Sequence, residues 1–261
     1  MKQAARLRFV GTLTVAGAFA LSSTPALAGQ SHEPEPRAYT CAGGEIPSGN
    51  YERITVTGAC SVAAGAVIRV SDDVKVTAGA ALDAQSAPST ITVGGDVKGA
   101  RGSTVGLGCQ PPSATGNSAH ECALDPTGQS TITVKGDVKV TNGELVALNG
   151  IKVRGDVTLT GGGGPNYWSI KNNTIGRNLK IEGVTADWLG VLFNIVGGNV
   201  SLTDISATDP GDPGRLVFVV RNVIGKNLSC ENLSPGVSGG FFPGSVNVVG
   251  GRALGQCSAL V

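Results

Sequence analysis

Four aspartates recur at one position of a repeated phrase, and lysines follow three of them. The aspartates are Asp73, Asp96, Asp137 and Asp156, and the lysines, each two residues further on, are Lys75, Lys98 and Lys139. A polysaccharide lyase needs carboxylates that bind Ca²⁺ together with a basic side chain, and a glycosidase needs carboxylates that face one sugar bond. The pattern raises the hypothesis of a polysaccharide-binding or polysaccharide-cleaving site with Asp137, Lys139 and Asp156 as candidate ligand-binding residues.

The same aspartates also have a purely structural explanation. Each one except Asp73 directly follows a glycine, and asparagine takes their place later, at Asn178, Asn199 and Asn227. Asp and Asn are both residues that form tight turns. A lysine beside stacked aspartates offsets the repulsion between like charges. We therefore expect the aspartates to fill a recurring corner, and we predict no catalytic residue.

Aromatic side chains supply a second candidate site, because aromatic rings stack on the faces of sugar rings. Tyr167 and Trp168 follow the run GGGGP, which predicts an insertion loop, and Trp188 lies in another segment outside the repeated phrase. A polysaccharide-binding surface built from these three rings is one interpretation. The interpretation that we favour is that they cover hydrophobic surface of the repeats.

The sequence lacks the motifs of several other classes of catalytic site. His120 stands in the run HEC, which does not match the zinc-binding H-E-x-x-H pattern, and the G-x-S-x-G motif of serine hydrolases does not occur. We find no phosphate-binding loop and no dinucleotide-binding fingerprint. We predict no metal and no cofactor.

The aspartates belong to a nine-residue frame whose odd positions are apolar or small. Copies run from Ile91 to Gly99, from Ile132 to Val140 and from Ile151 to Leu159. Strict alternation is the signature of a β-strand. Degraded copies start at Ile68, Asn173, Asn194, Asn222 and Asn247. A strand repeat of about 20 residues is typical of a β-solenoid.

We therefore predict an all-β, right-handed parallel β-helix with coils of about 19–28 residues. The frame starts at Ile91 and Ile132 lie about twice the usual interval apart. We interpret this long interval as two coils, one of them decorated.

Glycine and asparagine mark two devices that recur in the frame. Nearly every copy has a glycine at position 4 or 5, as in Lys135–Gly136 and Gly176–Arg177, where we expect a corner with positive φ. Asparagine replaces the inward aliphatic residue at position 1 in four later copies, Asn173, Asn194, Asn222 and Asn247. Because a buried amide is costly unless it is hydrogen-bonded, we predict an inward ladder of these four side chains across successive coils.

The N-terminus and the cysteines predict export. Lys2, Arg6 and Arg8 precede an apolar stretch and an A-x-A pattern that ends at Ala28, so we expect a signal peptide over residues 1–28. An even number of cysteines in an exported chain predicts disulfides, and neighbour pairing is the simplest choice among many. The cysteines are Cys41, Cys60, Cys109, Cys122, Cys230 and Cys257.

Domain organisation follows from the same composition. Residues 29–40 are rich in proline and charge and predict a flexible linker, and residues 41–261 predict a single solenoid domain. The 20 Lys and Arg nearly balance the 19 Asp and Glu, which argues against a nucleic-acid partner. No segment after the signal has the run of about 18 apolar residues that a membrane span needs. The predicted location is extracellular, in a bacterium.

The repeated coils also resemble a known group of proteins. The pattern N-x-[IV]-G-x-N-[LV], the run NLSCENL and the ending NVVGGRALGQCSAL are similar to uncharacterised secreted actinobacterial β-solenoid proteins, over about Cys41 to Val261. More distantly, the architecture resembles the pectate-lyase-like superfamily of right-handed parallel β-helices. The resemblance implies the fold and export, and it implies no activity. The N-terminal coils depart from the pattern, because they use Ile and Asp in place of Asn.

The function that we expect is a secreted, non-catalytic β-solenoid with a structural or adhesive role at the cell envelope or in the extracellular matrix. Cell-wall or extracellular polysaccharide is the expected partner. The rival hypothesis is a lyase-like, polysaccharide-active enzyme on the same scaffold.

Overall fold

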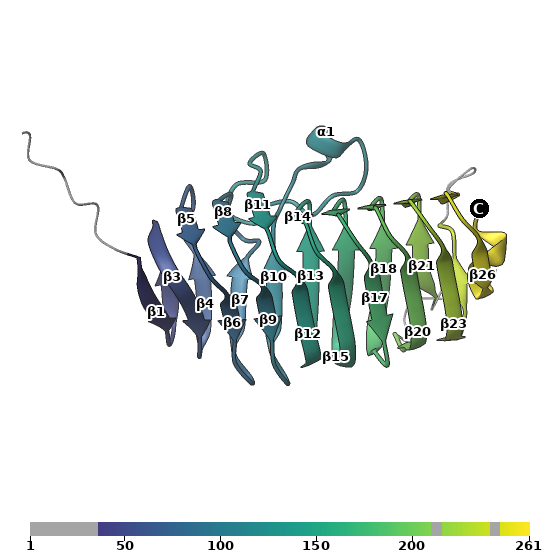
Figure 1. The fold of residues 1–261 in the computed structure, drawn as a ribbon, viewed down its shortest axis with the longest axis horizontal. Coiled ribbons are helices and arrows are strands. Elements are labelled where there is room, and N and C mark those ends of the chain that lie inside the picture. Colours follow the sequence, from purple (N-terminus) through teal and green to yellow (C-terminus); the bar gives the residue numbers. More distant parts are fainter. Residues whose placement is uncertain (1–35, 210–215, 241–245) are drawn as a thin grey trace, which may run out of the picture. The chain divides into compact units, whose positions relative to one another are not determined.

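The computed structural model describes residues 36–209, 216–240 and 246–261 (Figure 1). This part of the chain consists of strands β1 to β26, one short helix α1 (Pro112–Thr115) and one 3₁₀ helix η1 (Gln256–Ala259). All pairings between the named strands are parallel. The prediction of an all-β chain with parallel strands is confirmed, whereas the predicted signal peptide lies outside the described residues.

The strands form three ladders, which the chain visits in the order C, A, B. Ladder C holds the start of β3 (Gly49–Val56), then β5 (Val67–Val70), β8 (Thr90–Val93), β11 (Thr131–Val134), β14 (Lys152–Val153), β16 (Thr174–Ile175), β19 (Ile195–Val196), β22 (Val223–Ile224) and β25 (Val248–Val249). Ladder A holds β1 (Arg37–Cys41), the end of β3, β6 (Val74–Val76), β9 (Val97–Gly99), β12 (Val138–Gly143), the start of β15 (Val157–Lys171), β17 (Leu179–Glu182), β20 (Val200–Ala207), β23 (Leu228–Ser234) and β26 (Ala253–Gly255). Ladder B holds β2 (Gly44–Ile46), β4 (Ala59–Val62), β7 (Ala81–Ala84), β10 (Thr104–Leu107), β13 (Leu145–Asn149), the end of β15, β18 (Thr185–Leu192), β21 (Val217–Val220) and β24 (Val237–Ser238). We call one passage of the chain through C, A and B a rung.

In ladder C, equivalent positions of the repeated frame pair with one another on neighbouring rungs. Ile91 pairs with Ile68 on one side and with Ile132 on the other. Strand β8 therefore pairs directly with β11, and β9 pairs directly with β12. The prediction that the long interval holds two coils is wrong. The interval holds one rung. This rung is longer than the predicted upper limit of 28 residues per coil, because an insertion lengthens the connection from β10 to β11.

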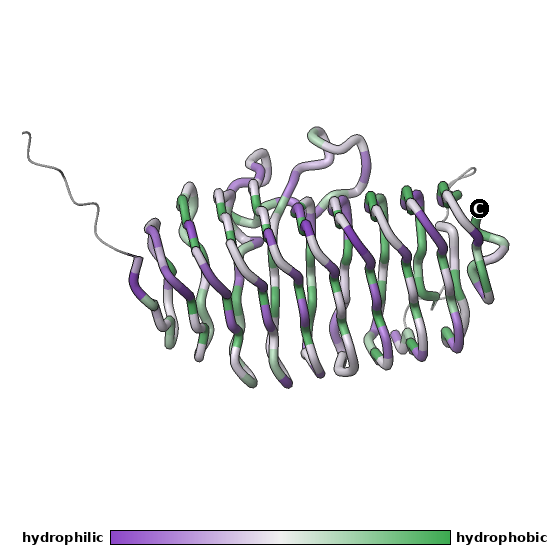
Figure 2. Tube along the Cα trace, viewed as in Figure 1, coloured by the Kyte–Doolittle hydropathy of each residue, from purple (hydrophilic) through white to green (hydrophobic). Residues whose placement is uncertain are grey.

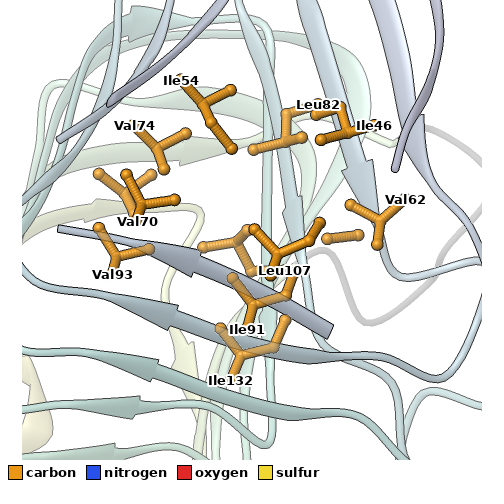
Figure 3. Close-up of a pocket in the computed structure, with 13 residues that line it drawn as sticks. Ile46, Ile54, Val62, Val70, Val74, Leu82, Ile91, Val93, Leu107 and Ile132 are labelled. Carbon is orange, nitrogen blue, oxygen red and sulfur yellow. The ribbon is translucent and has the colours of Figure 1, made fainter. Parts of the chain in front are cut away.

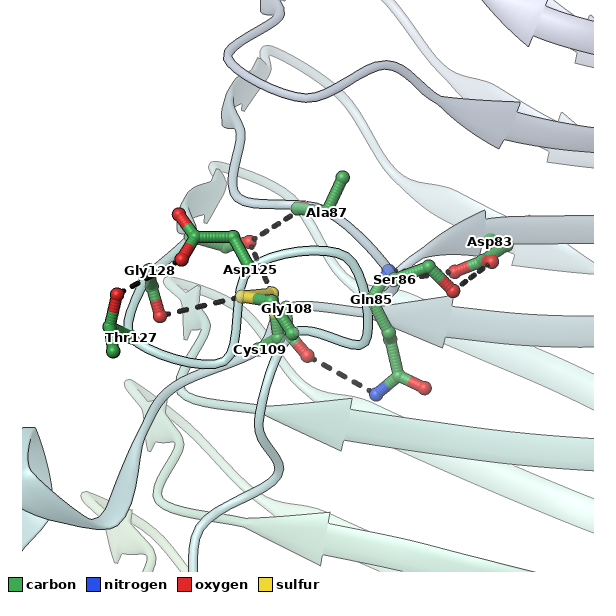
Figure 4. Close-up of a disulfide and its surroundings, with 11 residues drawn as sticks. Asp83, Gln85, Ser86, Ala87, Gly108, Cys109, Asp125, Thr127 and Gly128 are labelled. Atoms are coloured by element: carbon green, nitrogen blue, oxygen red, sulfur yellow. Dashed lines mark hydrogen bonds between the residues drawn. A yellow bond between two sulfur atoms is a disulfide. The ribbon is translucent and has the colours of Figure 1, made fainter.

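The insertion, residues 108–130, carries α1 and the disulfide Cys109–Cys122 (Figure 4). Gln85, from the preceding rung, donates its amide hydrogens to the carbonyls of Gly108 and Ala147, each at 3.2 Å. The side-chain amides of Asn117 and Asn172 exchange two hydrogen bonds. These contacts fasten the insertion to rungs on either side of its own connection.

Hydrophobic and hydrophilic residues alternate along many of the strands (Figure 2), and the burial of the residues alternates with them, so one face of each ladder lies inside the stack. In ladder A, five aligned aliphatic residues at the start of the strand are fully buried: Val138, Val157, Leu179, Val200 and Leu228. Their neighbours two positions on are buried as well, and the residues between face outward. The interior is thus a column of aliphatic side chains contributed by all three ladders.

The first rungs enclose a small apolar cavity of about 20 Å³ (Figure 3). Aliphatic side chains line it, among them Ile46 from β2, Ile54 from β3 and Ile91 from β8. A buried water needs two to four polar partners, and this lining offers none. The cavity is a packing gap between aliphatic side chains.

Two sequence predictions about chain segments need correction. The predicted linker over residues 29–40 is wrong for its end, because strand β1 begins at Arg37 and pairs with β3; residues 29–35 lie outside the described chain. The predicted insertion loop around Tyr167 is also wrong, because the segment lies within the single strand β15. The glycines at 161–164 have positive φ and bend this strand from ladder A into ladder B.

The predicted disulfide pairing is confirmed in full. Cys41 bonds to Cys60 on the first rungs, and Cys230 of β23 bonds to Cys257 of η1. Beside η1, the carbonyl of Leu260 accepts hydrogen bonds from the backbone N–H and the side-chain amide of Asn247. The C-terminal segment therefore satisfies donors that have no further rung to bond.

Candidate functional site: the corner between ladders C and A

The recurring aspartates and asparagines lie at the corner where the chain leaves ladder C for ladder A. Each side chain bonds to the backbone of its equivalent on the next rung. Oδ1 of Asp73 accepts the N–H of Asp96 at 2.8 Å, and Oδ1 of Asp96 accepts the N–H of Asp137 at 2.9 Å. The same bond recurs in the pairs Asp137–Asp156, Asp156–Asn178, Asn178–Asn199, Asn199–Asn227 and Asn227–Arg252. We call this row the corner ladder.

The corner glycines allow neighbouring rungs to approach each other closely. Gly136 and Gly155 do not have positive φ, so the conformational reason predicted from the sequence is wrong at these positions. A Cβ on Gly136 would lie under 3.0 Å from Oδ1 of Asp96 and from the backbone of Gly95. A Cβ on Gly155 would meet Oδ1 of Asp137 and the backbone of Gly136 in the same way. The phrase repeats because each glycine leaves room for the hydrogen bond made by the rung before it.

Two lysines of the row hold the second oxygen of the aspartates. Nζ of Lys98 lies 2.6 Å from Asp73 and 3.3 Å from Asp96. Nζ of Lys139 lies 2.7 Å from Asp137 and 3.5 Å from Asp96. Each lysine thus bridges two rungs, as expected if it relieves repulsion between stacked carboxylates.

These contacts decide the ionisation of the aspartates. For Asp96, partial burial opposes the charge, but the N–H of Asp137 and the ammonium of Lys98 outweigh it, so the pKa of Asp96 lies below its usual value. For Asp137, burial is likewise outweighed by Lys139 and the N–H of Asp156, and its pKa is lowered as well. A lowered pKa keeps a carboxyl ionised, which suits a hydrogen-bond acceptor and does not suit a general acid at neutral pH.

Asp156 differs from the aspartates before it in its partners. Its Oδ1 accepts both the backbone N–H and the side-chain amide of Asn178, each at 2.9 Å. From Asp156 onward the corner ladder continues through asparagine. The amide of Asn199 bonds to Asn178 in the same manner. An uncharged residue therefore performs the same structural role as the aspartate.

The inward asparagines form a second ladder, at the junction of ladders B and C. Oδ1 of Asn194 accepts the backbone N–H and the side-chain amide of Asn173, both at 3.0 Å. The same two bonds join Asn194 to Asn222 and Asn222 to Asn247. The second amide hydrogen of each side chain goes to a backbone carbonyl of ladder B on the preceding rung, such as that of Leu148 for Asn173. The side-chain amides of this buried row are thus hydrogen-bonded within the fold.

The aromatic candidates do not form one sugar-binding surface. Trp168 is fully buried, and its indole N–H donates to the carbonyl of Glu144 at 3.1 Å, so the prediction of Trp168 as a ligand contact is wrong. Alternation along β15 turns Trp168 inward and its neighbour Tyr167 outward, and Tyr167 is 58% exposed. Trp188 is half-buried, with its ring stacked on Phe218 at 5.7 Å between centroids.

Both sides of the Trp188 ring have neighbours. A Cβ on Gly190 would collide with it, so the ring lies over the backbone of β18. Nζ of Lys171 lies 5.8 Å from its centroid, and Tyr167 meets it edge-on at 6.4 Å. The cluster packs with Leu192 and Val220 on the outer face of ladder B. This arrangement covers hydrophobic surface, in agreement with the interpretation favoured from the sequence.

An open groove of about 260 Å³ lies at the corner between ladders C and A. It is lined by Asp96, Lys135, Gly136, Asp137, Arg154, Gly155 and Arg177. From the sequence, Lys135 and Arg177 are predicted only as neighbours of corner glycines, and the three cations are not recognised as a group. The signal was present, because a cation occupies frame position 4 or 5 on three successive rungs.

No family model, curated protein or solved structure matches the chain. Among the described residues, no group of three or more His, Cys, Asp or Glu side chains is placed to hold a metal ion. The described chain also has no helix with the length and apolar character of a membrane span.

Proposed function

We propose that the chain is a right-handed parallel β-helix. The support is that each rung visits ladders C, A and B in the same order and that equivalent positions pair in register, as Val134 does with Val93 and Val153. Right-handed crossover is the strong preference for parallel strands in one sheet. The β-solenoid proteins and the pectate-lyase-like superfamily that the sequence resembles have this architecture.

We further propose that the protein is exported and works outside the bacterial cell. Three disulfides join all six cysteines, and structural disulfides persist in oxidising compartments. The N-terminal signal pattern points the same way.

Within this setting, the function that the geometry supports best is a non-catalytic scaffold with a structural or adhesive role at the cell envelope or in the extracellular matrix. One observation carries the proposal. Each aspartate of the candidate row accepts a hydrogen bond from the next rung with one carboxylate oxygen. The other oxygen of Asp73, Asp96 and Asp137 forms an ion pair with a lysine. A lyase-like mechanism would need the same carboxylates and lysines, which are already engaged in contacts between rungs.

The test is co-sedimentation of the purified protein with a panel of insoluble glycans that includes peptidoglycan, while the supernatant is assayed for released sugar. We expect saturable pelleting without release of sugar. Release of unsaturated uronide by the wild type, lost in D137N, would overturn the proposal. D137N is the informative variant because asparagine performs the same hydrogen-bonding role on later rungs.

A further inference from the structure

The groove at the corner is too small to enclose a whole ligand. Its volume of about 260 Å³ lies below the range of roughly 300–1,000 Å³ in which pockets bury most of a small molecule. The groove is also open. It therefore suits one charged group or one sugar unit of a longer molecule that continues along the outside of the stack.

Three cations lie along the groove on three consecutive rungs. Lys135 and Arg154 hold equivalent positions, because the residues before them, Val134 and Val153, are paired in register. Arg177 follows on the next rung, where its N–H donates to the carbonyl of Gly155. All three residues are exposed, and neighbouring strands in a sheet lie about 4.8 Å apart. The result is a short row of positive charge parallel to the stacking direction.

The carboxylates of the lining do not neutralise this row. Asp96 and Asp137 are held by Lys98 and Lys139, which lie outside the lining. Within the described residues, no carboxylate lies within the 4.0 Å ion-pair distance of Lys135, Arg154 or Arg177. Three neighbouring cations without a carboxylate partner form a site that gains from an anionic ligand.

We propose that this basic groove, formed by Lys135, Arg154 and Arg177, binds an acidic group of a linear anionic glycopolymer that runs along the stack of rungs. Guanidinium groups bind carboxylate, phosphate and sulfate through two parallel hydrogen bonds, and lysine adds a point charge. The inference rests on the proposed adhesive function and names the ligand class of that function.

A glycopolymer fits the charge better than a nucleic acid does. Nucleic-acid binding relies on neutralising many phosphates at once, with about 6–10 contacts in a typical complex. The row holds three free cations within a chain that carries 20 basic and 19 acidic residues. An acidic polysaccharide with spaced charges needs only a local cluster of this size.

The experiment compares binding of the whole protein to dextran sulfate, carboxymethyl dextran and uncharged dextran, which share a backbone and differ in the anion. The variant K135Q/R154Q/R177Q removes the row. The variant R37Q/R69Q/R101Q removes the same charge from exposed residues outside the groove and serves as the control.

We expect both anionic polymers to bind and uncharged dextran not to bind. The groove variant should bind about ten-fold more weakly, because three exposed ion pairs with the polymer are lost. The control variant should stay within about two-fold of the wild type, because distant exposed charges are largely screened. The ratio of sulfate to carboxylate binding then tells which anion the site prefers.

Equal weakening in both triple variants, or binding of neither anionic polymer by the wild type, would overturn the proposal. Circular dichroism of each variant shows whether it is folded, and K135Q alone provides a milder change if the triple variant is not. Failure here is distinguishable from failure of the scaffold function. Release of sugar from the glycan panel would refute the scaffold, whereas pelleting that survives in the groove variant would refute only the basic groove.

Discussion

At the residue scale, the corner aspartates show how one side chain can look catalytic in a sequence and be structural in the fold. Acidic and basic residues at fixed spacing are what a polysaccharide-cleaving site requires, and they are also what a stack of identical corners requires. The hydrogen bonds separate the two. Oδ1 of Asp137 accepts the N–H of Asp156, and the role passes to asparagine at Asn178. What the corner needs is an acceptor oxygen, and a negative charge is optional.

This difference predicts the effect of two substitutions at Asp137. D137A removes the acceptor and leaves the N–H of Asp156 unsatisfied, so the free energy of unfolding should fall by about 1–3 kcal/mol. D137N keeps an acceptor oxygen and should lose less than half of that. Chemical denaturation measures both variants. Equal losses would mean that the carboxylate charge with Lys139, and not the hydrogen bond, stabilises the corner.

The lowered pKa values of Asp73, Asp96 and Asp137 predict how stability depends on pH. A carboxyl whose pKa is lower in the folded state stabilises the fold above its unfolded pKa and loses that contribution as pH falls through the folded pKa. We therefore expect stability to drop as pH falls below the ordinary value of 3.8. The variant D96N/D137N should give a shallower acid limb in a series of melting curves. An unchanged acid limb would assign the pH dependence to other carboxylates.

At the element scale, the alternation of apolar and polar residues predicts the ladders. The features that the sequence did not predict lie in the segments that connect one ladder to the next. The frame predicted which positions of β8, β11 and β14 stack, because period-two patterning and corner residues recur together. It did not reveal that residues 108–130 are an insertion in one rung, because an inserted segment of that length contains as many residues as a rung. It also misplaced Trp168, because four consecutive glycines are typical of a loop and here let β15 bend while it stays paired.

The inward amide ladder is the element whose loss should cost most. N194A would remove the acceptor of two donors on Asn173 and the donor to the carbonyl of Ile170, all of them buried. We expect a loss of about 2–4 kcal/mol in the free energy of unfolding. The control N199A changes a partly exposed corner residue and should cost less, because water can replace its bonds. A larger loss for N199A would contradict the importance of the inward row.

At the scale of the described unit, strands far apart in the sequence are neighbours because each rung rests on the one before it. The disulfides Cys41–Cys60 and Cys230–Cys257 lie in the first and last rungs, where a stack has only one neighbour to stabilise it. The exposed face between the ends carries the basic groove. A regular surface with a local charge cluster is what the proposed adhesion to an extended polymer requires.

The most direct measurement is disulfide cross-linking between outward positions of ladder C, read by mass spectrometry. Thr92 and Thr133 are paired in register on adjacent rungs. Their separation of about 4.8 Å lies within the range in which a disulfide forms, whereas residues two rungs apart lie about twice as far from each other. T92C/T133C should form a disulfide, and T92C/K152C, which skips one rung, should not. Absence of the first bond, or formation of the second, would contradict the stacking of rungs on which the corner, the amide ladder and the groove depend.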